Sequence, residues 1–266
     1  MREQIQIDGI DVFIEGQGDE TIVMIHGWPD TYRLWDAQVA LLQTKYRCVR
    51  FTFPGFDIEK PRQLFTLPQV IQIFKHIIEQ VSPNKKIILM VHDWACFFGY
   101  QFYMQNQTMV SKIIGVDGGD VYSTEHRSSL TARQKAVLYT YQLWLALAWC
   151  IGGRLGDKMT KLLIRLLSSS CKSDPQYISA CMNYPYYLRW FTGSLNKAPP
   201  PIISCPMLFI YGTKKPFMFH SKPWADHLSK QKENQVIALD TTHWVMIDEP
   251  EKFNQAVNAW LNASSD

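Results

Sequence analysis

The segment at residues 87–100, with the sequence IILMVHDWACFFGY, constrains the fold more than any other part of the chain. It begins with five apolar residues, Ile87 to Val91, which is typical of a buried central strand in a parallel sheet. A tight turn at 92–94 follows, and we expect a helix to begin at Ala95. Asp93 would then lie where a strand ends and a helix begins, the edge at which open α/β sheets bind ligands. The simpler interpretation is that Asp93 only caps the helix.

Strand and helix patterns alternate on both sides of this segment. Two short apolar runs around Asp8-Gly9 predict an N-terminal hairpin. Further strands are predicted at 21–25, 47–53, 112–116, 206–211 and 235–239, and helices at 32–42, 68–81, 224–229 and 250–261. This alternation predicts an α/β fold with a mostly parallel central sheet and helices on both faces.

Residues 120–200 interrupt the alternation. This part is helical and rich in aromatic residues, and Gly152-Gly153 is expected to divide it into two helices, followed by a polar break at 168–175. We therefore predict a core domain at 1–119 and 201–266, with a helical lid inserted between these two parts.

One stretch of the lid, Leu143 to Ile151, is apolar enough to raise the question of a membrane. It is too short to cross a bilayer, so we expect no integral membrane segment. Packing on the core is the favoured interpretation, and a helix lying in a membrane interface is the alternative.

The composition excludes several classes of protein. The net charge of +3 is modest and the basic residues are scattered, so we expect no nucleic-acid partner and no polybasic membrane patch. No glycine-rich phosphate loop or metal-ligand spacing is present in the sequence, so we expect no cofactor. The polar N-terminus does not resemble a signal peptide, and the six cysteines form no C-x-x-C pair, so we expect a cytoplasmic protein with buried thiols. These cysteines are Cys48, Cys96, Cys150, Cys171, Cys181 and Cys205.

Two further motifs follow predicted strands and would meet Asp93 at the same sheet edge. The sequence His26-Gly27-Trp28-Pro29 follows the strand at 21–25, and His243 follows the strand at 235–239. A nucleophile followed later in the chain by a histidine is the order found in α/β-hydrolases. A lone loop histidine is usually a surface residue, but these features together predict that His243 is a catalytic base.

These motifs resemble the α/β-hydrolase superfamily over nearly the whole chain, and within it the aspartate-nucleophile branch of epoxide hydrolases and haloalkane dehalogenases. The resemblance is carried by HGWPD at 26–30, HDWA at 92–95 and HWVMIDEPEKF at 243–253. It implies that Asp93 attacks a saturated carbon to form an alkyl ester, and that His243 activates the water that hydrolyses this ester. The backbone N–H groups of Trp28 and Trp94 would hold the oxyanion.

The residue that orients His243 departs from the most common pattern of this branch. Epoxide hydrolases usually supply an aspartate from a G-x-x-D turn, but the corresponding turn at 211–216 carries Lys215 at that position. Some dehalogenases place the acid after the strand that follows the elbow helix, which here indicates Asp117, with Asp120 as the second candidate. Asp117 would otherwise only shape the turn before the two glycines that follow it.

The resemblance also implies that lid tyrosines donate a proton when an epoxide opens. Tyr186 and Tyr187 lie where one such tyrosine is expected, and Tyr139 or Tyr141 would be its partner, although any single tyrosine more often has a packing role. His26 is a further candidate substrate-binding residue. The abundant aromatic residues predict an apolar pocket and a small hydrophobic substrate.

The preferred function is therefore hydrolysis of an epoxide to a diol. A haloalkane dehalogenase is the first alternative, because of the position of Asp117, and the related β-lactone decarboxylation is another. A hydrolase-like binding protein without catalysis is the non-enzyme alternative, and Lys215 is the residue that favours it. The sequence does not predict an oligomeric state.

Overall fold

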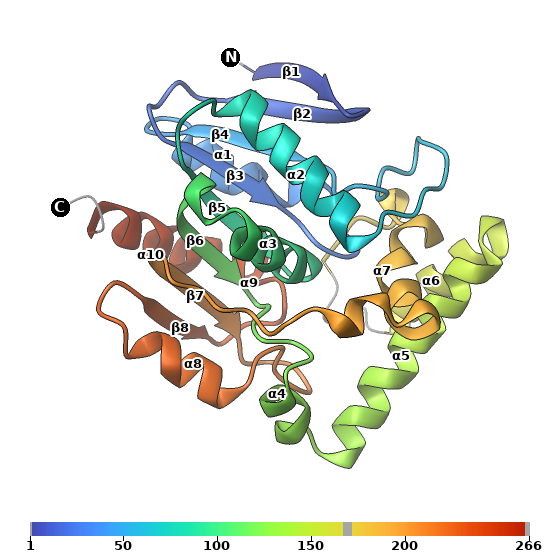
Figure 1. Cartoon of the computed structure of the whole chain (residues 1–266). Helices are drawn as coiled ribbons and strands as arrows, with labels where there is room; N and C mark the ends of the chain where they lie inside the picture. The colour runs from blue at the N-terminus through green and yellow to red at the C-terminus, as the bar shows by residue number, and fades with distance from the viewer. Residues whose placement is uncertain (1, 167–171, 264–266) are drawn as a thin grey trace.

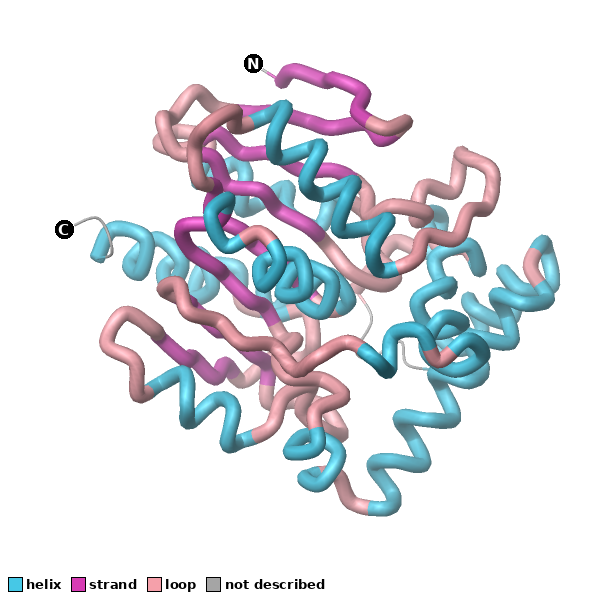
Figure 2. Tube along the Cα trace, in the orientation of Figure 1, coloured by secondary structure: helices cyan, strands magenta, loops and turns pink. Residues whose placement is uncertain are grey.

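The computed structural model describes residues 2–166 and 172–263, which form an eight-stranded sheet with helices on both faces (Figures 1 and 2). The strands lie in the order β1-β2-β4-β3-β5-β6-β7-β8. Strand β2 pairs antiparallel with both β1 and β4. The remaining neighbours in this order, from β4 through β3 to β8, pair in parallel. This confirms the predicted α/β-hydrolase fold class. The strands are β1 (Arg2–Ile7), β2 (Ile10–Glu15), β3 (Thr21–Ile25), β4 (Arg47–Phe51), β5 (Ile87–His92), β6 (Val110–Val116), β7 (Met207–Gly212) and β8 (Gln235–Leu239).

The central strand β5 is apolar throughout because helices cover both of its faces. Ile87, Leu89 and Val91 pack into the core on one side of the sheet. Ile88 and Met90 alternate with them and pack into the core on the other side. Helices α2 (Leu67–Val81), α3 (Trp94–Gln105) and α8 (Lys222–Ser229) cover the first face, and α1 (Asp36–Leu42), α9 (Val245–Asp248) and α10 (Pro250–Ala263) cover the second (Figure 1).

Helix α2 illustrates how local sequence sets the helix boundaries. Its first turn carries a capping box, in which the Gln69 side chain accepts a hydrogen bond from the Thr66 backbone N–H at 2.8 Å. Val70, Phe74 and Ile77 recur at helical spacing and are fully buried against the sheet. The helix begins one residue before the predicted range and ends at the predicted residue, Val81.

The chain between β6 and β7 is a helical insertion, with helices α4 (Thr124–Ser129), α5 (Ala132–Ile151), α6 (Gly153–Leu166) and α7 (Tyr184–Tyr187). Gly152 ends α5 with a positive φ of 62°, as the glycine pair predicted. Short 3-10 turns at Tyr32–Trp35, Gln107–Met109, Pro175–Tyr177, Ala180–Asn183 and Ser194–Lys197 and a π turn at Leu188–Thr192 complete the helical elements.

The α5–α7 part of the insertion lies beside the carboxyl ends of the parallel strands (Figure 1). Part of the predicted polar break at 168–175 falls outside the described residues, and the division into core and lid remains a prediction. None of the described helices, α5 included, has the combination of length and apolar character that is needed to cross a bilayer.

The cysteines differ in part from the expectation that they are buried. Cys48, Cys96 and Cys181 are buried free thiols and Cys205 is half-buried. Cys150 is exposed, because it lies on the solvent side of α5 near the end of that helix. Cys171 lies outside the described residues.

Candidate active site

The turn between β5 and α3 holds Asp93 in a conformation that non-glycine residues rarely adopt. Its φ is 55° and its ψ is −123°, so the backbone reverses sharply and the side chain is carried above the sheet edge. Helix α3 packs closely against β5 after this turn: a Cβ atom added to Gly99 would lie 2.9 Å from Val91 Cγ1. Small residues on α3 therefore permit the sharp turn at Asp93.

The loop after β3 supplies a hydrogen-bond donor to the Asp93 carboxylate. The Trp28 backbone N–H donates to Asp93 Oδ2 at 2.7 Å. A Cβ atom on Gly27 would lie 2.5 Å from that oxygen and 2.6 Å from the Trp94 backbone nitrogen, so only glycine fits at this position. Oδ2 thus lies in a corner formed by the backbone at 27, 28 and 94, and the participation of the Trp94 N–H remains a prediction.

His243 bridges two carboxylates. Its Nε2 lies 3.4 Å from Asp93 Oδ1, the oxygen that is not bound to Trp28, and its Nδ1 forms a short hydrogen bond with Asp117 Oδ2. The ring of His92 lies 4.4 Å from that of His243, and His92 Nε2 donates to the His243 backbone oxygen at 3.1 Å. The imidazole is therefore held with one nitrogen toward each acid.

Asp117, at the end of β6, is the acid that reaches His243. Its side chain is fully buried, and Oδ1 accepts the Gly212 backbone N–H at 3.0 Å. Asp120 is turned elsewhere: it accepts hydrogen bonds from the Ser221 N–H at 2.6 Å and from the Ser123 hydroxyl at 2.6 Å. Of the two candidates, only Asp117 contacts the histidine.

Lys215 also contacts Asp117, from the turn after β7. Its ammonium forms a short ion pair with Oδ1 and donates to the Gly212 carbonyl at 2.6 Å. The lysine side chain is only 6% exposed. Lys215, which stands where an aspartate was expected, therefore pairs with Asp117, which follows the neighbouring strand β6.

The charged groups that contact one another at this site shift each other's pKa values. Burial favours the neutral imidazole of His243, but the hydrogen bond and charge of Asp117, together with Asp93, outweigh burial and raise the pKa of His243 to about 9. Burial alone would raise the pKa of Asp117, but the charge of Lys215 and the hydrogen bond to His243 lower it. At neutral pH, His243 is therefore an imidazolium between two carboxylates.

A small cavity of about 30 Å³ lies in front of Asp93, between the sheet edge and the helical insertion. The ring of Tyr186 packs edge-on against those of Trp28 and Trp94, with ring centroids 5.7 and 5.2 Å apart. Burial raises the pKa of Tyr186 and of Tyr141, so both phenols keep their protons near neutral pH. The cavity is lined by Asp93, Trp94, Phe97, Asp117, Gly118, Val121, Tyr122, Tyr141, Gln142, Tyr186 and Phe219.

The model of the alpha/beta hydrolase family matches residues 22–256, which is most of the chain. The chain belongs to this family. Asp93, His243 and Asp117 thus lie together at one edge of the sheet of an alpha/beta hydrolase, with an aspartate at the turn between β5 and α3.

Several relatives of this alpha/beta hydrolase are epoxide hydrolases. Epoxide hydrolase 1 of Caenorhabditis elegans is 24% identical over 272 residues, which cover 93% of this chain and 66% of that protein. A crystal structure of the Bacillus megaterium epoxide hydrolase with an inhibitor has a TM-score of 0.75 at 21% identity, with 98% of this chain and 100% of that chain covered. A haloalkane dehalogenase from Bradyrhizobium elkanii has a TM-score of 0.71 at 16% identity, over 99% and 98% of the two chains. At these identities the structural likeness shows the fold alone.

The chain spans only part of the first curated relatives that it matches. It covers 66% of the C. elegans protein and 15% of the mycobacterial protein named EphD, with which it shares 35% identity over 90 residues. The comparisons support a hydrolase.

Three of the predicted substrate-binding residues of this alpha/beta hydrolase do not line the cavity. His26 is fully buried: its Nε2 accepts the Phe53 N–H and its Nδ1 bonds to the Gly27 carbonyl, both at 2.8 Å. Burial lowers the pKa of His26 to about 4, so the ring is neutral and braces the loop instead of contacting substrate. This corrects the expectation for His26.

The four lid tyrosines fall into two pairs. Tyr141 and Tyr186 line the cavity, with ring centroids 6.2 Å apart. Tyr187 is stacked between Trp149 and Phe191, and Tyr139 packs against Trp190, so these two serve packing within the insertion.

Sequence reasoning missed two polar residues of the cavity, Gln142 and Tyr122. The Gln142 amide donates to the Tyr141 hydroxyl at 3.4 Å and accepts the Trp190 indole N–H at 3.0 Å. The sequence could have identified Gln142, because it is a polar residue within an apolar helical stretch. Tyr122 has a φ of 76° and lies in a segment without periodicity, so no pattern identified it.

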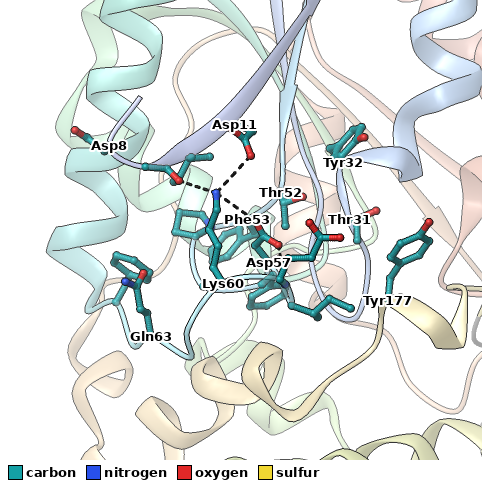
Figure 3. A pocket seen from close by; sticks show the side chains of 18 of the residues that line it. Asp8, Asp11, Thr31, Tyr32, Thr52, Phe53, Asp57, Lys60, Gln63 and Tyr177 are labelled. Carbon is teal, nitrogen blue, oxygen red and sulfur yellow. Dashed lines mark hydrogen bonds and ion pairs between the residues drawn. The ribbon is translucent and has the colours of Figure 1, made fainter. Parts of the chain in front are cut away.

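A second and larger hollow lies between the β1–β2 hairpin and the loop after β4 (Figure 3). Within it, Lys60 Nζ donates to the Gly9 carbonyl at 2.7 Å and pairs with Asp57 at 3.2 Å. Asp93, His243 and Asp117 do not line this hollow. Within the described ranges, no three His, Cys, Asp or Glu side chains are grouped so as to hold a metal ion.

Proposed function

We propose that this protein hydrolyses an epoxide to a diol through an alkyl ester on Asp93. The observation that carries the proposal is that the two oxygens of this carboxylate have different contacts. Oδ2 accepts the Trp28 N–H, while Oδ1 lies 3.4 Å from His243 Nε2, and Asp93 lines the cavity together with Tyr141 and Tyr186. The epoxide hydrolases among the relatives support the same reaction.

In the first step, Asp93 Oδ1 attacks one epoxide carbon and forms the ester bond while the carbon–oxygen bond of the ring breaks. The electron pair of the broken bond stays on the departing oxygen. A phenol of Tyr186 or Tyr141 gives that oxygen its proton and later recovers one from solvent. Positioned hydroxyls are needed here because an alkoxide is a poor leaving group.

In the second step, His243 Nε2 takes a proton from water, and the water oxygen bonds to Asp93 Cγ. The negative charge that develops on Oδ2 is held by the Trp28 N–H. When this intermediate collapses, the bond between Cγ and the alkyl oxygen breaks, and the imidazolium returns the proton to the diol. Asp93 is then a carboxylic acid with one oxygen from water, and it gives the second water proton to the neutral imidazole, which restores the carboxylate and the imidazolium.

The positive charge of Lys215 balances the charge of Asp117 through both steps of the reaction. Before alkylation, two carboxylates (Asp93 and Asp117) face two cations (His243 and Lys215), so these four groups are neutral with the imidazole protonated. Alkylation removes the charge of Asp93. The remaining groups are then neutral only if the imidazole loses its proton, which is the form that can activate water.

The other titratable groups near His243 do not change this balance. Burial lowers the pKa of His92 to about 3 and that of His220 to about 4, so both rings are neutral at pH 7. The buried carboxyl of Asp30 accepts hydrogen bonds from the Ser173 hydroxyl and the Trp244 indole N–H, and burial raises its pKa to about 6, so it is mostly ionised at pH 7.

Dehalogenation is the second candidate, because Asp117 occupies the acid position found in some dehalogenases. The ester chemistry on Asp93 would be the same, with a halide as the leaving group. The buried phenols of Tyr141 and Tyr186 favour the epoxide, since a halide leaves without needing a proton. The binding-protein alternative is weakened by the contact between Asp117 and His243.

The test is to incubate the protein separately with styrene oxide, a dihaloalkane and a nitrophenyl ester, and to measure diol, halide and phenolate. We expect diol, and the Asp93→Asn variant should lose roughly 10⁴-fold or more of the rate. The matched control is Asp226→Asn, which changes an exposed carboxylate on α8. Halide alone would favour the dehalogenase, phenolate alone would favour an esterase, and an unchanged rate in Asp93→Asn would refute the nucleophile.

A further inference from the structure

Helix α6 presents an apolar stripe to solvent. Leu155 is 59% exposed and Leu166 is 75% exposed, and Leu162 between them is also exposed. Their spacing along the helix places all three on one face. The opposite face, with Gly156, Thr160 and Ile164, is buried against the rest of the insertion. The apolar stripe is therefore the outer face of α6.

The stripe continues onto α5 across the Gly152 turn. Leu143, Leu147 and Ile151 are exposed and recur every four residues, so they lie along one side of α5 and end next to the start of α6. Figure 1 shows α6 at the outer end of the insertion, away from the sheet. Exposed apolar residues scattered singly are ordinary, but six of them aligned on a helical hairpin indicate a contact surface.

A row of basic side chains runs along one flank of this stripe. Its members are spaced by three or four residues, and none of them forms an ion pair with a carboxylate of the described residues. They are Arg154, Lys158, Lys161 and Arg165. Asp157 is the acidic residue of α6, and its carboxylate already accepts the Ser179 hydroxyl and the Ala180 N–H, each at 2.7 Å. The flank is therefore cationic.

We propose that the α5–α6 hairpin is a docking surface for an anionic lipid bilayer. The apolar stripe would lie among the upper acyl chains, and the basic row would lie against the lipid phosphates. A second copy of the chain fits this surface less well, because it would bring four more cations and the already bonded Asp157. The proposal does not depend on the chemistry at Asp93.

The experiment measures co-sedimentation of the full chain with vesicles of phosphatidylcholine, with or without about 30% phosphatidylserine. We expect binding to the anionic vesicles, weaker binding to the neutral ones, and loss of binding as salt is raised. The double variant Lys158→Glu with Arg165→Glu should weaken binding to anionic vesicles about thirtyfold or more, since each basic residue near the surface contributes about fivefold. The double variant Leu155→Gln with Leu162→Gln should weaken binding to both kinds of vesicle.

Matched controls change the same residue types elsewhere on the surface. Lys230→Glu with Lys232→Glu alters two exposed lysines beyond α8, and Leu41→Gln alters an exposed leucine of α1. These variants should bind vesicles as the wild type does, and all variants should keep the wild-type melting temperature because the altered side chains are exposed.

Three results would overturn the proposal. The first is no binding to either kind of vesicle, and the second is binding that the α6 variants do not change relative to the controls. The third is concentration-dependent dimerisation of the wild type that the leucine variants abolish, without vesicle binding, which would assign the surface to a second copy of the chain.

Discussion

Replacing Asp117 with asparagine separates the structural role of this residue from its chemical role. Asparagine is one of the few side chains that tolerate the φ of 52° at this position, so the backbone should be retained. The substitution removes the negative charge that pairs with the buried Lys215 ammonium, which keeps its hydrogen bond to the Gly212 carbonyl. Breaking a buried ion pair in this way costs roughly 3–5 kcal/mol of unfolding free energy. For a chain of this size, that loss lowers the melting temperature by roughly 6–20 °C.

The double variant Asp117→Asn with Lys215→Met removes both charges. Because no unpaired ammonium remains, we expect its unfolding free energy to return to within about 2 kcal/mol of the wild type. Diol formation should stay roughly 10³–10⁴-fold below the wild type, because His243 has lost the carboxylate that orients it.

Urea unfolding followed by circular dichroism measures the stability of both variants. The control is Asp240→Asn, which breaks the exposed pair with Lys214 and should leave the unfolding free energy nearly unchanged. The reasoning is refuted if Asp117→Asn is no less stable than this control, or if the double variant is as unstable as the single one.

Three further outcomes follow from the geometry of the site. Gly27→Ala places a Cβ atom 2.5 Å from Asp93 Oδ2, so the diol rate should fall roughly 10²–10³-fold while the protein still folds; a wild-type rate would contradict the close approach. Tyr186→Phe should lower the rate of epoxide opening roughly 10²-fold or more and Tyr187→Phe much less, and equal losses would argue against Tyr186 as a proton donor. The pKa of His243 is raised to about 9 from an unfolded value of 6.5, so its contribution to stability is complete below pH 6.5 and is lost as the pH rises through 9. Urea unfolding should show this decline in the wild type and a shallower one in His243→Gln.

The sequence predicted those parts of the fold that depend on local pattern. The apolar run of β5 identified the central strand because a strand covered on both faces has no polar side. The glycine pair identified the end of α5 because only glycine adopts its positive φ without strain. Asp93 and His243 were predicted to lie close together because they follow strands whose carboxyl ends meet at one sheet edge.

The parts that were missed depend on contacts between distant segments. Lys215 was expected to weigh against catalysis, yet neighbouring strands bring it against Asp117, a pairing that no local pattern encodes. His26 belongs to the right motif, but a motif does not indicate whether a side chain faces a cavity or the core. The basic residues of α6 form no run in the sequence, since their spacing of three or four residues gathers them only when the helix forms.

Trapping of the ester on Asp93 tests the central claim most directly. In the His243→Gln variant the first step should proceed and the second should stop, so incubation with styrene oxide should add the mass of one epoxide to each chain. Peptide mapping should place that mass on Asp93, and hydroxylamine should remove it. A His243→Gln protein that turns over without an adduct, or that carries the adduct on another residue, would contradict the mechanism.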